Sequence, residues 1–525
     1  MKRKNIFRGI GVLVFSLLTV TSCSNFEDLN RDPSRSNDMD PNLILPALQL
    51  QLNNNFEEWH RVMIYPGGFV QQWCGDWAVT NYGCQANMNT TYFYEIWIRK
   101  YRDIIKNVVD IIERTKDDDA KANINALARI LKVYVFCQLT DMYGDIPYSE
   151  AGVGYYEGIL RPKYDKQEDI YNDFFIQLEQ AYQQLNQNAD NITYDHYFNG
   201  DIRKWKKFAN SLRLRLAMRL VKVNPVKAQQ EAEKAVSNGV MESNDDICLI
   251  RFENVSGSTT ILELGNGLAN RLNADGRYFR YSSRLIGYME STADPRITIY
   301  GGCYLEDANY TDITSQIYAV KGSYEDMARP TGNFNWEGNP GNITITVDGI
   351  DVNVAGGLQL LQPSKWFMAS DAPYIIMSYA EVAFFMAEAK LRGWNIPGTA
   401  EQYYEAGLRS SIEQMTLYGA PAVPDAAIDQ FISRNVLVTG QEMGQINMQI
   451  WVGHVLNPYE AYANWRRTNI PDLTYLEYMG SDGTAKTPRR ILYPSEEQVS
   501  NPDNYNEAVG RVSGYDWTVG VWWDK

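Results

Sequence analysis

Histidine, on which several kinds of catalytic site depend, is scarce in this chain of 525 residues. The three histidines, His60, His196 and His454, show no metal-binding spacing, and the sequence has no HExxH, GxSxG, GxxxxGK[ST] or GxGxxG motif. These absences argue against zincins, serine hydrolases of the nucleophile-elbow type, and proteins with nucleotide-binding loops. We therefore expect no metal and no cofactor, and these motifs single out no catalytic residue.

One enzymatic alternative stays open, because a glycosidase needs only two suitably placed carboxylates. Asp141 and Asp145 in "TDMYGDIPY" would be one such pair, but the Gly and Pro beside them favour a turn that ends a helix. The chain is rich enough in Asp and Glu that composition does not decide the question.

Cysteine is also sparse, with six residues in all. Cys23 stands apart, just after an apolar run at the start of the chain; without it five cysteines remain, and an odd number cannot all pair. Cys74 and Cys84 flank a short polar segment and form the only plausible local disulfide, which the sequence leaves open. Cys137 falls within an apolar helical pattern and is expected to be a buried thiol.

Basic residues are outnumbered by acidic ones, 49 to 64, which gives a formal charge of −15. Nucleic-acid binding requires clustered Lys and Arg, so this class of partner is excluded. The one basic stretch, between Arg203 and Arg219, spreads around a predicted helix, and we expect it to form a solvated, ion-paired face.

Long apolar runs are missing, and the clearest short one lies at the start of the chain. Residues 10–20 are almost wholly apolar and follow a basic head, but about 20 residues are needed to span a bilayer. This pattern is typical of a signal peptide, here 1–22. "VTSC" is similar to a bacterial lipobox and makes Cys23 the predicted lipid attachment site, with 23–40 as a lipidated tether.

Helical periodicity dominates the rest of the chain, which predicts a mostly α fold. Apolar residues recur every three or four positions, so that helices pair along the chain. The predicted pairs are 92–114 with 121–143, 167–186 with 203–222, 378–393 with 399–418, and 441–453 with 458–466. The third pair resembles a tetratricopeptide repeat. We expect one domain over 41–525, with helical halves at about 90–240 and 374–470.

A Gly-, Asn- and Thr-rich region, about 240–373, interrupts the helices and is predicted to be an irregular insertion with short β-hairpins. "ITITVDGIDVNV" (343–354) reads as a hairpin, because Asp348-Gly349 suits a two-residue type I′ turn. Pairing across that turn sets Val347 opposite Ile350 and Ile343 opposite Val354, on one face.

Tyrosine and tryptophan are abundant, at 35 and 13 residues, and both offer an apolar ring with a polar tip. Two segments place aromatics among Gly, Asn and Gln without a helical or strand period: 67–83 and 330–342. A sugar ring would suit such groups, although loop tryptophans also commonly pack a loop onto the body. The candidate ligand-binding residues are Trp73, Trp77, Tyr82, Arg280, Tyr281, Asn335 and Trp336.

Six stretches in order, behind the lipobox, carry a resemblance to a known family: "CQLTDMYGDIPYSEA", "WKKFANSLRLRLAMR", "YIIMSYAEVAFFMAEAKLRGW", "EAYANWRRTNIPDL", "PRRILYPSEEQVSNPDNYNEA" and "VWWDK". The chain resembles the SusD/RagB lipoproteins of Bacteroidetes. The resemblance implies four helix-pair repeats with irregular insertions. It also implies a non-catalytic, lipid-anchored outer-membrane protein that faces the cell exterior, binds oligosaccharides, host-derived glycans included, and delivers them to a SusC-like TonB-dependent transporter. A peptide ligand, or an exported glycan-degrading hydrolase, remains the alternative.

Overall fold

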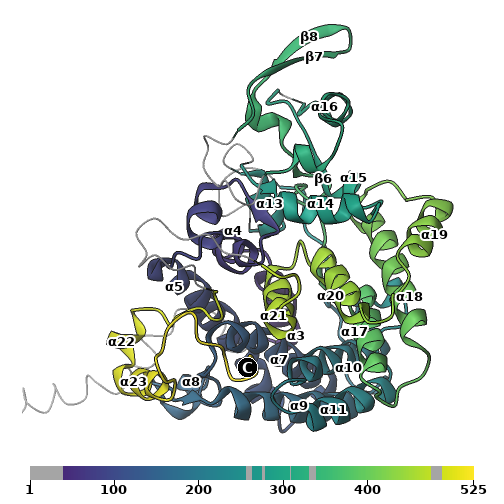
Figure 1. Ribbon diagram of the computed structural model, residues 1–525. Coiled ribbons are helices and arrows are strands. Elements are labelled where there is room, and N and C mark those ends of the chain that lie inside the picture. Colours follow the sequence, from purple (N-terminus) through teal and green to yellow (C-terminus); the bar gives the residue numbers. More distant parts are fainter. Residues whose placement is uncertain (1–38, 256–262, 275–277, 308, 330–338, 474–486) are drawn as a thin grey trace, which may run out of the picture.

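Helices make up most of the computed structural model, which describes residues 39–255, 263–274, 278–307, 309–329, 339–473 and 487–525 (Figure 1). The strands are two to five residues long and form two-stranded pairs. A single cluster of buried apolar side chains extends from Leu45 to Trp523. The predicted mostly α class is confirmed. None of the described helices combines the length and apolarity that crossing a bilayer requires.

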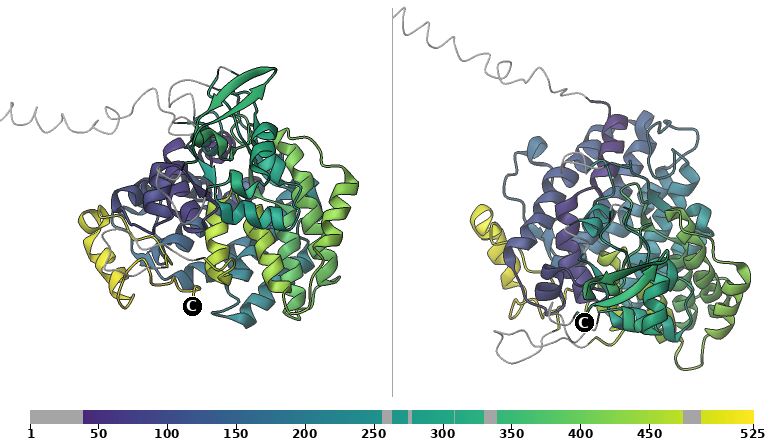
Figure 2. Two further views of the ribbon diagram at one scale, coloured as in Figure 1. Left: turned by 45° about the horizontal axis from the view of Figure 1, so that its top comes forward. Right: turned by 90° about the horizontal axis from the view of Figure 1, so that it is seen from above.

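The first half of the chain supplies most of the long helices on one side of the body (purple and blue in Figure 2). Their bounds are α3 (Pro41–Gln51), α4 (Phe56–Val62), α5 (Thr90–Arg99), α6 (Lys106–Thr115), α7 (Ala122–Tyr143), α8 (Gly154–Glu157), α9 (Gln167–Gln184), α10 (Ile202–Arg219) and α11 (Pro225–Asn238). π-Helical segments η2 (Met63–Gly67), η3 (Val79–Gly83) and η4 (Lys100–Ile105) join or extend them. The predicted helix 92–114 is therefore divided at η4.

Helix pairing in this half follows loop length. α6 packs on α7, and α7 on α9. α10 touches α9, as predicted, but packs more extensively on α11, because only a short turn separates α10 from α11 whereas a long loop separates it from α9. Asn224 caps α11 by accepting the Lys227 N–H, and Pro225 takes the first helical position.

Much of the second half forms the other side of the body (green in Figure 2), whereas the last part of the chain (yellow) lies beside the first half. The helices of the second half are α17 (Tyr379–Leu391), α18 (Ala400–Glu413), α19 (Asp425–Arg434), α20 (Glu442–Gly453), α21 (Pro458–Thr468), α22 (Glu497–Ser500) and α23 (Pro502–Gly510). A capping box of Thr399 and Gln402 opens α18. The last segment returns to the first half, where the Ile491 N–H donates to the Met142 carbonyl at 2.9 Å.

The insertion is closed at its base by a strand from each end. β4 (Cys248–Ile250) pairs antiparallel with β10 (Tyr374–Met377). Between them lie α13 (Gly267–Asn273), β5 (Arg280–Tyr281), α14 (Ser283–Ser291), α15 (Ile297–Tyr300), β6 (Gly301–Gly302), α16 (Thr314–Lys321), β7 (Ile343–Val347), β8 (Ile350–Val354) and β9 (Gln362–Pro363). The region holds more short helices than its composition predicted.

The predicted hairpin, β7 with β8, extends away from the body at the top of Figure 1. Its register is confirmed, with Val347 opposite Ile350 and Ile343 opposite Val354. Asp348 and Gly349 both have positive φ, at 49° and 81°, as a type I′ turn requires. The apolar face is buried at its base, at Val354, and exposed at its tip, at Ile350.

Candidate ligand-binding site

A short strand and a turn position the segment that carries the first predicted aromatics. β1 (Trp73–Cys74) pairs antiparallel with β5, which sets Trp73 opposite Tyr281. Gly75 follows with φ +93°, and a Cβ atom there would overlap the Tyr278 carbonyl oxygen, so only glycine fits. Asp76 then accepts the Ala78 N–H at 2.9 Å, which starts the helical turn that leads into η3.

Two glycines let η3 lie directly against η2. A Cβ atom on Gly83 would overlap the Ile64 carbonyl oxygen, and one on Gly68 would press on the Gly83 backbone. This close approach fixes the segment between Gly75 and Gly83 on the body. Asn81 adds a local hydrogen bond from Nδ2 to the Trp77 carbonyl at 2.8 Å.

The outcome is a row of three aromatic rings that begins at the surface. Trp77 is 55% exposed and meets Tyr82 edge to face at a centroid distance of 5.4 Å. Tyr82 meets Tyr92 of α5 in the same way, also at 5.4 Å. The Arg61 guanidinium lies 4.3 Å from the centre of the Tyr92 ring. The structure thus brings two predicted residues, Trp77 and Tyr82, together. We call Trp77, Tyr82 and Tyr92 the aromatic row.

Polar side chains behind the aromatic row form a compact cluster. Asp76 lies 3.7 Å from His60 Nε2 and 3.5 Å from Arg271, and Arg61 Nη1 lies 2.9 Å from His60 Nδ1. Burial opposes ionisation of Asp76, but the hydrogen bond and charge of His60, a backbone N–H and the nearby Arg271 lower its pKa below the ordinary value. Arg61 also pairs with Glu57 at 3.3 Å.

Three predicted ligand residues must be corrected, because they are buried. Trp73 is fully buried, stacks on Tyr281 at 4.4 Å, and donates its indole N–H to the Val455 carbonyl at 2.9 Å. Tyr281 is equally buried and donates its hydroxyl to Tyr300 O at 2.8 Å. Arg280 donates to the Gly357 carbonyl at 2.9 Å, and burial lowers its pKa to about 10. These three side chains therefore pack inside the protein, where a ligand cannot reach them.

Other predicted positions stand as follows. Asn335, Trp336 and Cys23 lie outside the described residues. Cys74 and Cys84 are both buried free thiols, as is Cys137. The pairing left open by the sequence is thus not formed in this structure. Burial raises the pKa of Cys74 to about 12, so this thiol is not a reactive nucleophile.

The sequence pattern did not single out four residues of this site. Tyr92 belongs to the aromatic row, and the polar cluster behind it contains His60, Arg61 and Arg271. His60 and Arg61 lie side by side in α4 and look like ordinary exposed positions in "FEEWHRV". Tyr92 belongs to a helix in which Trp97 is buried and Tyr94 is half-buried, so its own place could not be read from the helical pattern. These residues come together only through packing between α4, α5 and α13.

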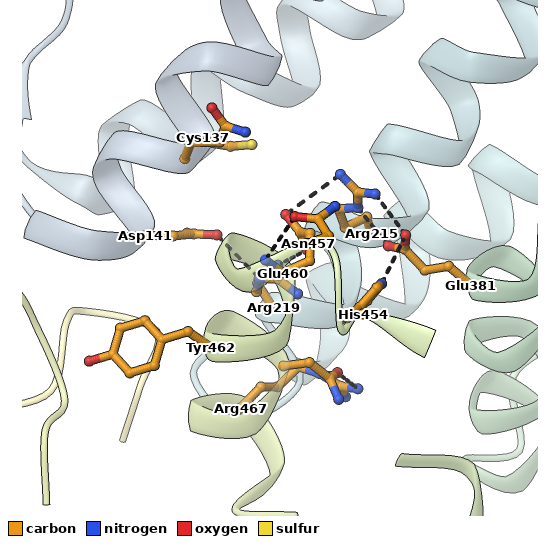
Figure 3. Close-up of polar contacts among 12 residues, drawn as sticks. Cys137, Asp141, Arg215, Arg219, Glu381, His454, Asn457, Glu460, Tyr462 and Arg467 are labelled. Carbon is orange, nitrogen blue, oxygen red and sulfur yellow. Dashed lines mark hydrogen bonds and ion pairs between the residues drawn. The ribbon is translucent and has the colours of Figure 1, made fainter. Parts of the chain in front are cut away.

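A second polar cluster lies deep between the helices (Figure 3). Arg215 of α10 binds Glu381 of α17 through Nε and Nη2, at 2.6 and 2.7 Å, and lies 3.5 Å from Glu460 of α21. Arg219 pairs with Glu460 and, at 3.2 Å, with Asp141 of α7. All five side chains are buried. Four helices are therefore joined by ion pairs.

This cluster corrects the expectation that the basic stretch is a solvated face. Arg203 does lie at the surface, but Arg213, Arg215 and Arg219 are buried against carboxylates. Burial would raise the pKa of Glu381, yet Arg215 and His454 outweigh it and lower that pKa to about 2. A glycosidase acid needs a raised pKa and access to substrate, so Glu381 does not suit that role.

Comparisons with known proteins agree with this architecture. The SusD-like family, described as starch-binding and associating with the outer membrane, matches residues 33–494. A solved chitin-binding protein is 38% identical, with 92% of this chain and 100% of that chain covered and a TM-score of 0.79. A SusD-like protein described as Bacteroidetes AC2a is 33% identical, with 93% and 100% covered and a TM-score of 0.84.

A more distant structure shares the fold alone. It is a chitin-binding SusD homologue from Flavobacterium johnsoniae, 24% identical, with 92% of this chain and 98% of that chain covered and a TM-score of 0.71. No curated protein matches the chain. The family match over most of the sequence and the two relatives above 30% identity establish membership. The chain therefore belongs to the SusD-like family of proteins that associate with the outer membrane.

Proposed function

We propose that this protein is a non-catalytic, lipid-anchored binder of a neutral oligosaccharide, with the aromatic row as its ligand surface. The exposed Trp77 carries the proposal. An indole that is half exposed in an ordered turn offers a flat apolar face, and such a face can cover the apolar face of a sugar ring. Its neighbour Tyr82 can add a second ring and a hydroxyl.

The charges around the row favour a neutral ligand. Each cation has an anionic neighbour within the protein, since Arg61 pairs with Glu57 at 3.3 Å and Arg271 with Asp76 at 3.5 Å. An acidic sugar would have to compete for these guanidinium groups. We therefore rank uncharged glycans above sialylated ones.

Chitin oligosaccharides are the first candidates, because the solved relative at 38% identity is named chitin-binding. Starch oligosaccharides come second, because the family description names starch. An acetamido group also offers a donor and an acceptor to the polar groups beside the row.

Titration calorimetry with chitohexaose and maltohexaose tests the proposal. Losing one ring contact should weaken binding about tenfold, which corresponds to about 1.4 kcal/mol, so Trp77→Ala should show this loss. Tyr194→Ala is the matched control, because Tyr194 is exposed to the same degree, 56% against 55%, at another place. Wild-type affinity in a folded Trp77→Ala variant would refute the assignment of the row.

The transporter partner and the anchor complete the proposal. Family resemblance supports delivery of the ligand to a SusC-like TonB-dependent transporter, and the lipobox supports attachment through Cys23. Release of new reducing ends from chitohexaose by the purified protein would instead favour a hydrolase. If the wild type binds neither sugar but binds peptides, the ligand class is wrong.

A further inference from the structure

A separate groove is lined by residues of α5 and α22, two helices that lie on the same side of the molecule in Figure 1. It encloses about 320 Å³ and is bordered by α5, the segment 159–162 and α22. Its lining is mainly apolar, with the aromatic side chains Tyr94, Trp97 and Tyr101. Leu160 stands at its rim and is 89% exposed. The aromatic row does not contribute to it.

An acidic side chain forms the polar part of this groove. Glu497 accepts a hydrogen bond from the Tyr164 hydroxyl at 2.6 Å, which fixes the carboxylate against the aromatic lining. Burial raises its pKa, the adjacent Glu496 raises it further, and hydrogen bonds from Tyr164, Trp97 and Ser500 only partly oppose this. Within the described part of the chain, neither Glu496 nor Glu497 forms an ion pair with Lys, Arg or His.

A partly buried carboxylate with no counter-ion is costly, and a cation from outside would remove that cost. The half-buried rings of Tyr94 and Tyr101 also suit a cation, because an ammonium group is attracted to the face of a Tyr ring. Trp97 is only 3% exposed and already packs against Tyr101 and Tyr164, so it supports these rings and offers no free face. A charge-assisted hydrogen bond to Glu497 would fix its position. Buried Glu381 differs, since Arg215 already pairs with it.

We propose that this groove binds the protonated amine of an amino sugar, such as a glucosamine unit in partly deacetylated chitin. The proposal rests on the proposed glycan function. The volume lies at the lower end of the range for ligand pockets, about 300–1,000 Å³, which suits a short stretch of sugar. A pyranose ring would also cover apolar side chains such as Leu160 and Tyr94, which a lysine side chain would leave largely exposed.

Calorimetry with three probes tests it: chitosan hexamer, chitohexaose and pentalysine, at slightly acidic pH, where sugar amines are protonated. The test variant is Glu497→Gln, which keeps an oxygen for the Tyr164 hydroxyl but removes the charge. We expect it to bind chitosan hexamer at least tenfold more weakly than wild type and to bind chitohexaose as wild type does. Tyr94→Ala should weaken chitosan hexamer in the same direction.

Equal chitosan affinity for wild type and a folded Glu497→Gln variant would overturn the proposal. So would pentalysine that binds more tightly than chitosan hexamer with the same dependence on Glu497, because the occupant would then be a peptide. Trp77→Ala separates this site from the aromatic row. If Trp77→Ala leaves chitohexaose unaffected while Glu497→Gln weakens chitosan hexamer, the aromatic row fails and the groove stands.

Discussion

Glu381 should make the fold acid-sensitive in a measurable way. Its carboxylate is buried and pairs with Arg215 at 2.6 Å, and its pKa falls from 4.5 to about 2. Each unit of pKa corresponds to about 1.36 kcal/mol, so the ionised Glu381 contributes about 3 kcal/mol to the free energy of unfolding.

The direction of the pH effect follows from the sign of that displacement. A lowered pKa means that the stabilisation is complete above the ordinary value of 4.5 and is lost as the pH falls toward 2. Glu388, paired with Arg467, is lowered to about 2 as well and acts in the same direction. Asp141 acts in the opposite direction, because burial raises its pKa.

The test is Glu381→Gln, followed by urea unfolding at neutral pH and near the pKa of the folded state. At neutral pH the variant should lose about 3–5 kcal/mol, because the charge of Arg215 is then balanced only by the more distant Glu460, at 3.5 Å, among the described carboxylates. Near pH 2, where Glu381 of the wild type becomes protonated, the difference in the free energy of unfolding between wild type and variant should be smaller. Glu242→Gln is the control, an exposed partner of Lys207 expected to cost under about 1 kcal/mol. A Glu381→Gln deficit that does not change with pH would refute the reasoning.

Three further predictions follow from other parts of the chain. Gly83→Ala should destabilise the protein by about 1–3 kcal/mol or more, because the added Cβ would overlap the Ile64 carbonyl oxygen and push η3 away from η2. Gly444→Ala is the control, since a Cβ atom there would meet open space. Equal melting temperatures of the two variants would contradict this. Cys23→Ala should leave a folded protein that no longer sediments with membranes after a carbonate wash, and continued membrane attachment would count against the anchor. Purification of the wild type in mild detergent should recover a large outer-membrane transporter in near-equal amount, and recovery of the lipoprotein alone in several detergents would count against the partnership.

The helices were predictable because their causes are local. Apolar periodicity, the Asn224 cap and the Thr399 capping box all act within a few residues, and the structure keeps them. The hairpin register was predictable for the same reason, since a two-residue turn fixes it. Pairing was less predictable where a long loop intervenes, as between α9 and α10.

Burial of individual polar and aromatic residues was harder to predict, because distant segments decide it. Trp73 and Trp77 lie in one segment of uniform composition, yet β5 covers the first and leaves the second exposed. Arg215 and Arg219 offered a partial signal, since each follows an apolar residue of α10 by three positions and so lies beside its buried stripe. The neighbouring sequence did not indicate which carboxylates on α7, α17 and α21 would pair with them.

Indole N–H groups show how ligand residues can be told from framework residues once the structure is known. Trp59, Trp73 and Trp451 each donate to a backbone carbonyl, at 2.9–3.0 Å, and each is buried. Their polar tips serve to fasten one segment to another. The Trp77 N–H has no such acceptor among the described residues, and its ring is half exposed. Under the proposed function, a bound sugar would cover the exposed part of this ring and accept a hydrogen bond from its N–H, which is why Trp77, and not the three buried tryptophans, is the residue to mutate in the binding test.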